Sequence, residues 1–183
     1  YDNISSSSTY KFRVTTGVKD SAGNTLSSQW TTSNGFTTSW TRQFGTSENE
    51  YVYGVKVDSS NNIYVTGETR GGLDNNTNSG GCDIFLVKYY DNGTKQWTKQ
   101  MGTSSCDVVR GVTLDNSSNI YVTGYTQGGL DGNTLSGSSG TYDVILVKYN
   151  SSGTKQWTKQ FGNSNPGNTQ GHDDLAYELT VDS

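Results

Sequence analysis

The sequence predicts an all-β protein assembled from repeated units, and three observations support this. The 183 residues include 23 Gly and 12 Tyr but one Pro and one Met. Gly favours turns, whereas Tyr, Thr and Val favour strands. Apolar residues alternate with the period of a strand and show no helical spacing. The segment GTKQWTKQ stands at 93–100 and again at 153–160, and internal repeats of this kind indicate stacked units that share a core.

The repeat extends well beyond this segment. Trp40, Trp97 and Trp157 each open one copy of a shorter segment, which reads WTRQFG, WTKQMG and WTKQFG in turn. Three further pairs of segments keep step with it: NIYVTGET and NIYVTGYT (62–69 and 119–126), GGLDNNT and GGLDGNT (71–77 and 128–134), and DIFLVKY and DVILVKY (83–89 and 143–149). A tryptophan present in every unit is expected to be a structural repeat position, with ligand binding as the alternative.

One unit contains four predicted strands. YVYGVKVD (51–58) alternates apolar and polar residues, and NIYVTG (62–67) follows a short polar turn. DIFLVKY (83–89) is apolar on both faces, as expected of a strand that is covered on both sides. TKQWTKQM (94–101) follows Asn92-Gly93, where glycine supplies the positive φ of a short hairpin loop.

Four antiparallel strands per repeat are typical of a β-propeller blade. We expect two full blades at about 39–101 and 102–161, and the start of a third at 162–183, because LAYELTVDS (175–183) matches the first strand. Two blades and a start cannot close a ring of about four to eight blades. The missing strands are therefore expected from further blades of the same chain or from neighbouring copies.

The last strand of each blade is expected to lie at an edge of its sheet. There Trp97 shares one side of the strand with Lys95, Lys99 and Met101. The ring can pack on a neighbouring sheet while the lysine stems cover it and the ammonium groups reach water. Lysine on an edge strand also discourages pairing with stray chains.

Taken together, these segments resemble the SBBP repeat, a bacterial family named for seven-bladed β-propellers. The resemblance covers residues 39–183. It implies a secreted or surface-attached protein and brings no catalytic residues to carry over. Residues 1–38 do not follow the repeat. Their segments TYKFRVTTGVKDSAGNTL (9–26) and WTTSNGFTT (30–38) resemble the C-terminal strands of a bacterial Ig-like domain, a β-sandwich whose earlier strands are not in this sequence.

The charge and hydropathy patterns argue against two classes of partner. The formal net charge is −4, and no basic run suggests a nucleic-acid footprint. No stretch approaches the roughly 18 apolar residues of a membrane span, so we do not expect this segment to cross a membrane.

Cys82 and Cys106 are expected to form a disulfide. Cys82 precedes the third strand of one blade, and Cys106 lies in the connection to the next. In a propeller these two places emerge on the same face. An even cysteine count in a secreted protein supports pairing; two free buried thiols are the alternative.

The GGLD loops are candidate calcium or ligand sites. Asp74, Asn75 and Asn76 in one loop, and Asp131 and Asn133 in the other, are rich in the oxygen ligands that Ca²⁺ prefers. The spacing is not that of an EF-hand, and Asp and Asn are also ordinary turn residues. No other cofactor is expected.

Three further polar residues are candidates for chemistry. Asp83 and Asp143 stand just before buried strands, and we expect loop amides to hold them. His172 lies beside two aspartates in a Gly/Asn-rich stretch, where a solvated side chain is expected.

These features favour a non-enzymatic secreted or cell-surface protein of bacterial origin, a rigid scaffold for binding or adhesion to a surface glycan or protein. The GGLD loops would be its contact surface, since loops on rigid scaffolds often carry binding. One alternative is a structural subunit of an extracellular fibre or surface layer. Another is a polysaccharide-active propeller enzyme whose site lies in further blades.

Overall fold

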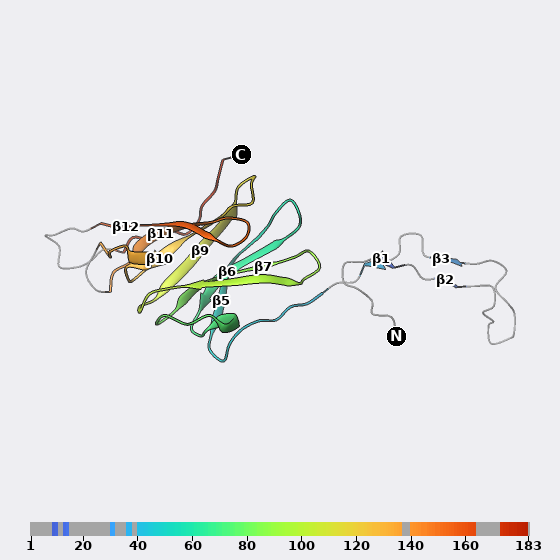
Figure 1. Ribbon diagram of the computed structural model, residues 1–183, viewed down its shortest axis with the longest axis horizontal. Helices are drawn as coiled ribbons and strands as arrows, with labels where there is room; N and C mark the ends of the chain where they lie inside the picture. Colours follow the sequence, from blue (N-terminus) through green and yellow to red (C-terminus); the bar gives the residue numbers. More distant parts are fainter. Residues whose placement is uncertain are drawn as a thin grey trace. The chain divides into compact units, whose positions relative to one another are not determined.

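The structure is a computed structural model that describes residues 40–136, 140–163 and 173–182, together with four two-residue strands before residue 40. The chain divides into two compact units, residues 1–42 and 43–183. Figure 1 shows the course of the chain through both. His172 lies outside the described residues.

The first unit contains two antiparallel strand pairs. β1 (Thr9–Tyr10) pairs with β4 (Phe36–Thr37), and β2 (Arg13–Val14) pairs with β3 (Trp30–Thr31). These strands fall in the two segments that the sequence assigns to an Ig-like domain. The connecting residues lie outside the described part, and the Ig-like assignment stays a prediction.

The second unit contains two four-stranded antiparallel sheets. In each sheet the strands are neighbours in chain order, which confirms the predicted four-stranded sheets. Residues 173–182, expected to include the first strand of a third blade, are described but form no strand. Figure 1 shows both sheets in the same half of the picture. Their strands are β5 (Glu50–Val57), β6 (Ile63–Thr69), β7 (Asp83–Tyr89) and β8 (Lys95–Met101), then β9 (Asp107–Leu114), β10 (Ile120–Thr126), β11 (Asp143–Tyr149) and β12 (Lys155–Phe161).

A β-bulge interrupts the first strand of each blade. The register between β5 and β6 shifts between Val52 and Gly54, and the register between β9 and β10 shifts at the equivalent place, so Tyr53 and Arg110 have no partner across the sheet. Gly124 lies opposite the second bulge, where a Cβ atom would stand 1.9 Å from the Val108 carbonyl oxygen. The glycine of NIYVTG is thus required by the close approach of the bulged strand.

The main core lies between the two sheets. Tyr64, Ile84 and Leu86 of the first blade pack against Val109 and other residues of the second, with Trp97 and Met101 at the margin. The residues of the second blade in this core are Val109, Val112, Ile120, Val122, Leu130, Ile145, Val147 and Tyr149. The two blades therefore share one continuous core.

A smaller core covers the opposite face of the first blade. Phe85, Val87 and Tyr89 are buried there with Leu73. Phe44 covers them, with its ring centroid 5.7 Å from that of Phe85. Every residue of β7 is buried as a result, which confirms a strand covered on both sides.

The last strand of each blade, β8 or β12, agrees with the sequence prediction in most respects. Gly93 and Gly153 adopt φ of 76° and 79° in the preceding turns. Trp97 packs against the core with Lys99 over its ring at 6.0 Å. Trp157 is 36% exposed, and Trp40 lies outside the strands with Arg42 over its ring. The sequence predicts Lys95 on the same side of the strand as Trp97. In the structure, the ammonium group of Lys95 instead binds an aspartate of the GGLD loop.

Candidate functional site

Each GGLD loop folds back onto its own blade. The 3₁₀ turns η1 (Leu73–Asn75) and η2 (Leu130–Gly132) bury their leucines. In the first loop, Asp74 accepts hydrogen bonds from Lys95 at 2.5 Å and from Thr98. Lys155 and Thr158 bind Asp131 in the same way.

A glutamine of the last strand closes each loop. The Gln100 side-chain oxygen accepts from the Leu73 amide at 2.9 Å, and its nitrogen donates to the Gly71 carbonyl and to Asp83, each at 3.0 Å. Gln160 makes the equivalent contacts in the second blade. The lysine, threonine and glutamine of KQWTKQ therefore recur because each one holds the loop of its own repeat.

Four of the five predicted calcium residues, Asp74, Asn76, Asp131 and Asn133, have partners within the protein. The amides of Asn76 and Asn133 donate to the carbonyls of Leu73 and Leu130, each at 2.7 Å. Burial would raise the pKa of Asp74, but its bonds to Lys95 and Thr98 outweigh this, so the pKa lies below its usual value. In the part of the chain that the structure describes, no group of three or more His, Cys, Asp or Glu side chains could hold a metal ion. Calcium binding by these loops stays a prediction.

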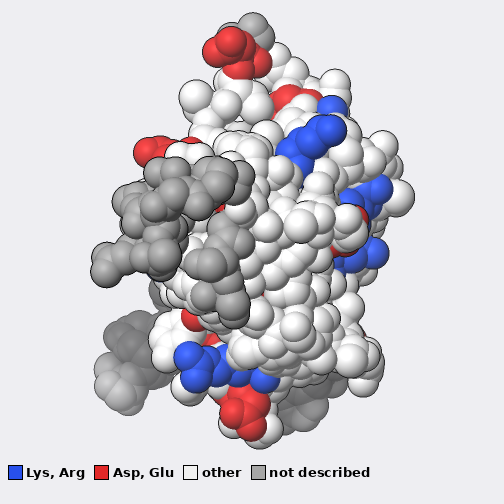
Figure 2. Space-filling model, turned by 90° about the vertical axis from the view of Figure 1, so that its left-hand side faces the viewer, with Lys and Arg blue, Asp and Glu red and all other residues white. Residues whose placement is uncertain are grey.

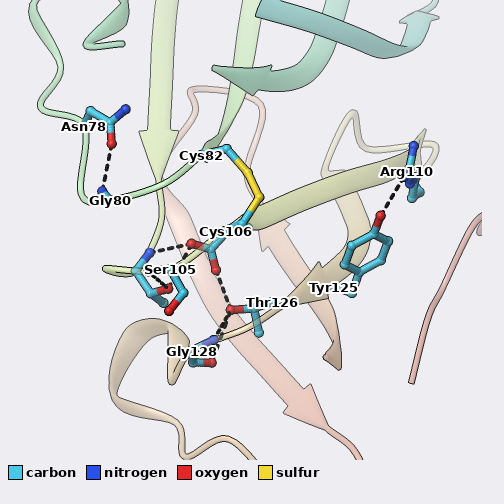
Figure 3. Close-up of a disulfide and its surroundings, with 11 residues drawn as sticks. Asn78, Gly80, Cys82, Ser105, Cys106, Arg110, Tyr125, Thr126 and Gly128 are labelled. Carbon is cyan, nitrogen blue, oxygen red and sulfur yellow. Dashed lines mark hydrogen bonds between the residues drawn. A yellow bond between two sulfur atoms is a disulfide. The ribbon is translucent and has the colours of Figure 1, made fainter. Parts of the chain in front are cut away.

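Cys82 and Cys106 form a disulfide, as the sequence predicts. Their Cα atoms lie 4.5 Å apart. Two backbone hydrogen bonds flank the bridge, from the Gly81 amide to the Ser105 carbonyl at 2.9 Å and from the Asp107 amide to the Cys82 carbonyl at 2.8 Å. Figure 3 shows the bridge joining the end of the loop to the link between the blades.

Aspartates support the same end of the blades. The Ser79 and Ser136 amides donate to Asp83 and Asp143, each at 2.8 Å, which confirms that loop amides hold both carboxylates. Asp107 accepts from the Thr103 amide and from the Thr126 hydroxyl. Burial raises the pKa of Asp107, and the charge of Asp83 adds to the increase.

Beside the disulfide lies a group of side chains that sequence reasoning did not single out. We call Tyr53, Glu68, Arg110, Tyr125 and Tyr142 the Arg110 cluster. The Arg110 guanidinium donates to the Tyr125 hydroxyl at 2.5 Å and lies 4.5 Å from the Tyr53 ring centroid and 5.3 Å from that of Tyr125. Tyr142 packs edge-on against Tyr125 at 4.9 Å. Figure 3 shows the Arg110–Tyr125 pair near the disulfide.

The charges of the cluster are only partly compensated. Glu68 is 8% exposed, and burial raises its pKa although Arg110 and Arg70 oppose the increase. In the described part of the chain, no carboxylate oxygen lies within 4.0 Å of a nitrogen of Arg110. The guanidinium is therefore held by aromatic rings and a hydroxyl instead of an ion pair.

Arg110 and Tyr53 line a groove between the first strands of the two blades. The groove has a volume of about 360 Å³, within the range of small-ligand sites. Its other walls come from β5, β9 and residues 177–179: Gly54, Val55, Lys56, Gly111, Val112, Tyr177, Glu178 and Leu179. The bulges direct Tyr53 and Arg110 into this shared position, because each removes its residue from the sheet pairing.

A sequence signal for this cluster exists in the differences between the repeats. Tyr53, Arg110 and Tyr177 lie the same number of residues before the aspartate that ends the first-strand segment of each repeat, so they occupy equivalent positions. Glu68 and Tyr125 occupy another, within otherwise matching NIYVTG segments. The KQWTKQ segment that holds each GGLD loop recurs unchanged in both blades, whereas Arg110 replaces the tyrosine found at Tyr53 and Tyr177, and Glu68 and Tyr125 differ from each other. Such variation within a repeat predicts a specific surface.

The comparisons with known proteins agree with this architecture. A family model described as a β-propeller repeat, SBBP, matches residues 39–74 and 96–131. Each match runs from the residue before a repeat tryptophan to the aspartate of the following GGLD loop. The two four-stranded antiparallel sheets are consistent with β-propeller blades. The two matched segments support the SBBP repeat in particular.

A distant relative also carries repeats. The chain is 28% identical over 150 residues to an uncharacterized WD repeat-containing protein, L264, of Acanthamoeba polyphaga mimivirus. The alignment covers 68% of this chain and 11% of the relative. The chain thus spans about a tenth of that protein's length. Among the helices in the described residues, none has the length and apolar character needed to cross a membrane.

Proposed function

We propose that the protein is a non-enzymatic binding scaffold, secreted or attached to a bacterial surface, which contacts surface polysaccharide through the groove beside the Arg110 cluster. The observation that carries this proposal is the position of the cluster. Tyr53 and Arg110 stand at equivalent bulges, differ between repeats, and meet in a groove on two blades that share one core. A rigid support of this kind favours binding, because little order is lost when the ligand arrives.

Two parts of the proposal rest on further arguments. The disulfide favours an oxidising compartment, since such bonds persist outside the cytosol. The Arg110 side chain stays charged at all physiological pH values and suits holding a ligand better than moving a proton. Incubation of the protein with a panel of polysaccharides tests the non-enzymatic part, and hydrolysis or elimination products would contradict it.

The binding itself is tested with the two exposed rings of the groove. Tyr53→Ala combined with Tyr177→Ala should reduce retention of the protein on immobilised neutral and acidic polysaccharides, since the rings form its open walls. The control is Tyr90→Ala, a ring that is 48% exposed and does not line the groove. Equal retention of the double variant and the control, or no retention of the parent protein, would contradict the assignment.

The GGLD loops are less suited to be the contact surface. Leu73 is fully buried, so replacing residues 71–81 would remove part of the core together with the loop. The side chains of Asp74 and Gln100 are already engaged within the blade. The groove leaves the rings of Tyr53 and Tyr177 exposed, which is why we assign binding to it.

A second candidate is a structural subunit whose neighbouring copies continue the stack of blades. Val52 and Val55 on β5 are 54% and 55% exposed, whereas the equivalent Val109 and Val112 are 0% and 4% exposed beneath the first blade. At the other end Phe161 is 55% exposed. Figure 2, which views the molecule from the side of β12, shows a broad uncharged area with charges in separate small groups.

Light scattering over a range of protein concentrations tests this second candidate. Assembly that Val55→Asp prevents would support stacking between copies through the β5 face. A protein that stays monodisperse at its molecular mass, at the highest concentration reached, would contradict it.

A further inference from the structure

The groove contains a cation that makes no direct ion pair with the described residues. Arg110 donates to the Tyr125 hydroxyl and also interacts with Tyr53, and no carboxylate of the described residues lies within 4.0 Å of it. Its Nε atom is buried and has no hydrogen-bond acceptor among those residues. A buried donor without an acceptor marks a place where water or a ligand group belongs. The groove is therefore suited to an anionic group.

The geometry of the guanidinium selects the kind of anion. A planar guanidinium can donate two parallel hydrogen bonds to the two oxygens of a carboxylate. The rings of Tyr53 and Tyr125 lie 4.5 Å and 5.3 Å from the Arg110 guanidinium carbon and restrict its orientation. A single carboxylate is the group that this arrangement fits.

The walls of the groove indicate what the carboxylate is attached to. Tyr53 is 37% exposed and Tyr177 is 63% exposed, and both line the groove. Each ring offers an apolar face with a hydroxyl at its edge, while Lys56 and Glu178 add a donor and an acceptor. A sugar ring has the matching surfaces, with C–H groups on its faces and hydroxyls around its edge.

The surrounding charge argues against a ligand with many carboxylates. Glu68 lies close enough to influence Arg110, and Glu178 lines the groove. The chain as a whole carries a net charge of −4. A run of carboxylates, as in an acidic peptide, would be repelled by these groups. An isolated carboxylate on an uncharged ring is repelled least.

We propose that the groove binds a uronic acid unit of a polysaccharide, with Arg110 holding the carboxylate and Tyr53 and Tyr177 packing against the sugar ring. This inference rests on the proposed function and names the ligand class of the same site. Lys56 and Glu178 contact the hydroxyls of the unit at the rim. No bond is made or broken.

The test is a titration of the intact protein with glucuronate, followed by ligand-observed NMR. Glucose serves as the same ring without the carboxylate, and acetate as the carboxylate without the ring. Glucuronate should bind about tenfold or more tightly than either, since a hydrogen-bonded charge pair contributes about that factor. Arg110→Gln should remove this preference, and Arg110→Lys should restore it only in part, because lysine lacks the planar fork.

The matched control is Lys159→Gln, which removes one positive charge from an exposed residue of β12 that does not line the groove. It should bind glucuronate as the parent does. Equal loss in both variants, equal binding of glucose and glucuronate, or tighter binding of a poly-glutamate peptide would overturn the uronate assignment. Thermal unfolding of Arg110→Gln verifies its fold. The uronate assignment can fail while the proposed function stands. That result would be retention on neutral polysaccharide that still depends on Tyr53 and Tyr177.

Discussion

Asp74 and Asp131 each tie a loop to the last strand of their own blade with the same two partners. Lys95 and Thr98 bind the first, and Lys155 and Thr158 bind the second. Both aspartates adopt positive φ, 51° and 53°. Asp and Asn tolerate this conformation better than most residues, which explains why this position can be Asp in both repeats.

Asp74→Asn should lower the free energy of unfolding by about 1 kcal/mol at pH 7, since it weakens hydrogen bonds to a charged acceptor that is partly exposed to solvent. The pKa of Asp74 lies below its usual value of 3.8. Its ionised form therefore stabilises the fold above that pH, and the contribution is lost as the pH falls through the lowered pKa.

Urea unfolding measured from pH 7 downward checks this expectation. The difference between parent and variant should shrink once the pH falls below 3.8, where the aspartate of the unfolded chain is protonated. Asp131→Asn is the internal replicate and should behave alike. A constant difference across the whole range would show that charge is not the cause.

At the scale of elements, the disulfide joins the end of a GGLD loop to the link between the blades, two connections that are far apart in the sequence. Cys82 and Cys106 are 24 positions apart in the sequence, and all of β7 and β8 lies between them. Tyr125 and Tyr142 pack with the same cysteines. The bridge therefore supports both the link between the blades and the two tyrosines, Tyr125 and Tyr142, of the Arg110 cluster.

Replacing both cysteines with alanine should reduce the free energy of unfolding by about 3 kcal/mol, because the unfolded chain regains the freedom of a loop of this length. Chemical unfolding of the parent and the double variant measures the loss. A reducing agent should destabilise the parent by a similar amount and leave the variant unchanged. Equal sensitivity of both proteins to the reductant would refute the role of the bridge.

Repeated elements also show where sequence reasoning succeeded and where it did not. The four strands of the blade, the turn at Gly93 and the double-sided burial of β7 follow from local patterns, because alternation and turn residues act over a few positions. The position of the Lys95 side chain could not be predicted from such local patterns. A register shift between β7 and β8 precedes Trp97, and the partner of Lys95, Asp74, comes from another part of the blade.

At the scale of the whole molecule, stacking of blades decides which apolar residues are buried. Val112 is 4% exposed because the first blade covers it, whereas the equivalent Val55 is 55% exposed. Val112→Ala should cost about 1 to 2 kcal/mol, since the buried methyl groups are lost. Val55→Ala should change the stability by less than about 0.5 kcal/mol. Equal effects in thermal unfolding would mean that the two valines share the same surroundings.

The sequence by itself determined the all-β class, the repeat, the strands of each blade and the pairing of the two cysteines. The first three features are local or recur along the chain, whereas the pairing of the cysteines followed from the loop positions expected in a propeller. Only the tertiary structure brought Tyr53, Glu68, Arg110 and Tyr125 together. The bulges remove two of these residues from sheet pairing, and packing of the blades places them side by side. Contacts between residues so distant in sequence depend on how the sheets stack, and no short sequence pattern encodes that.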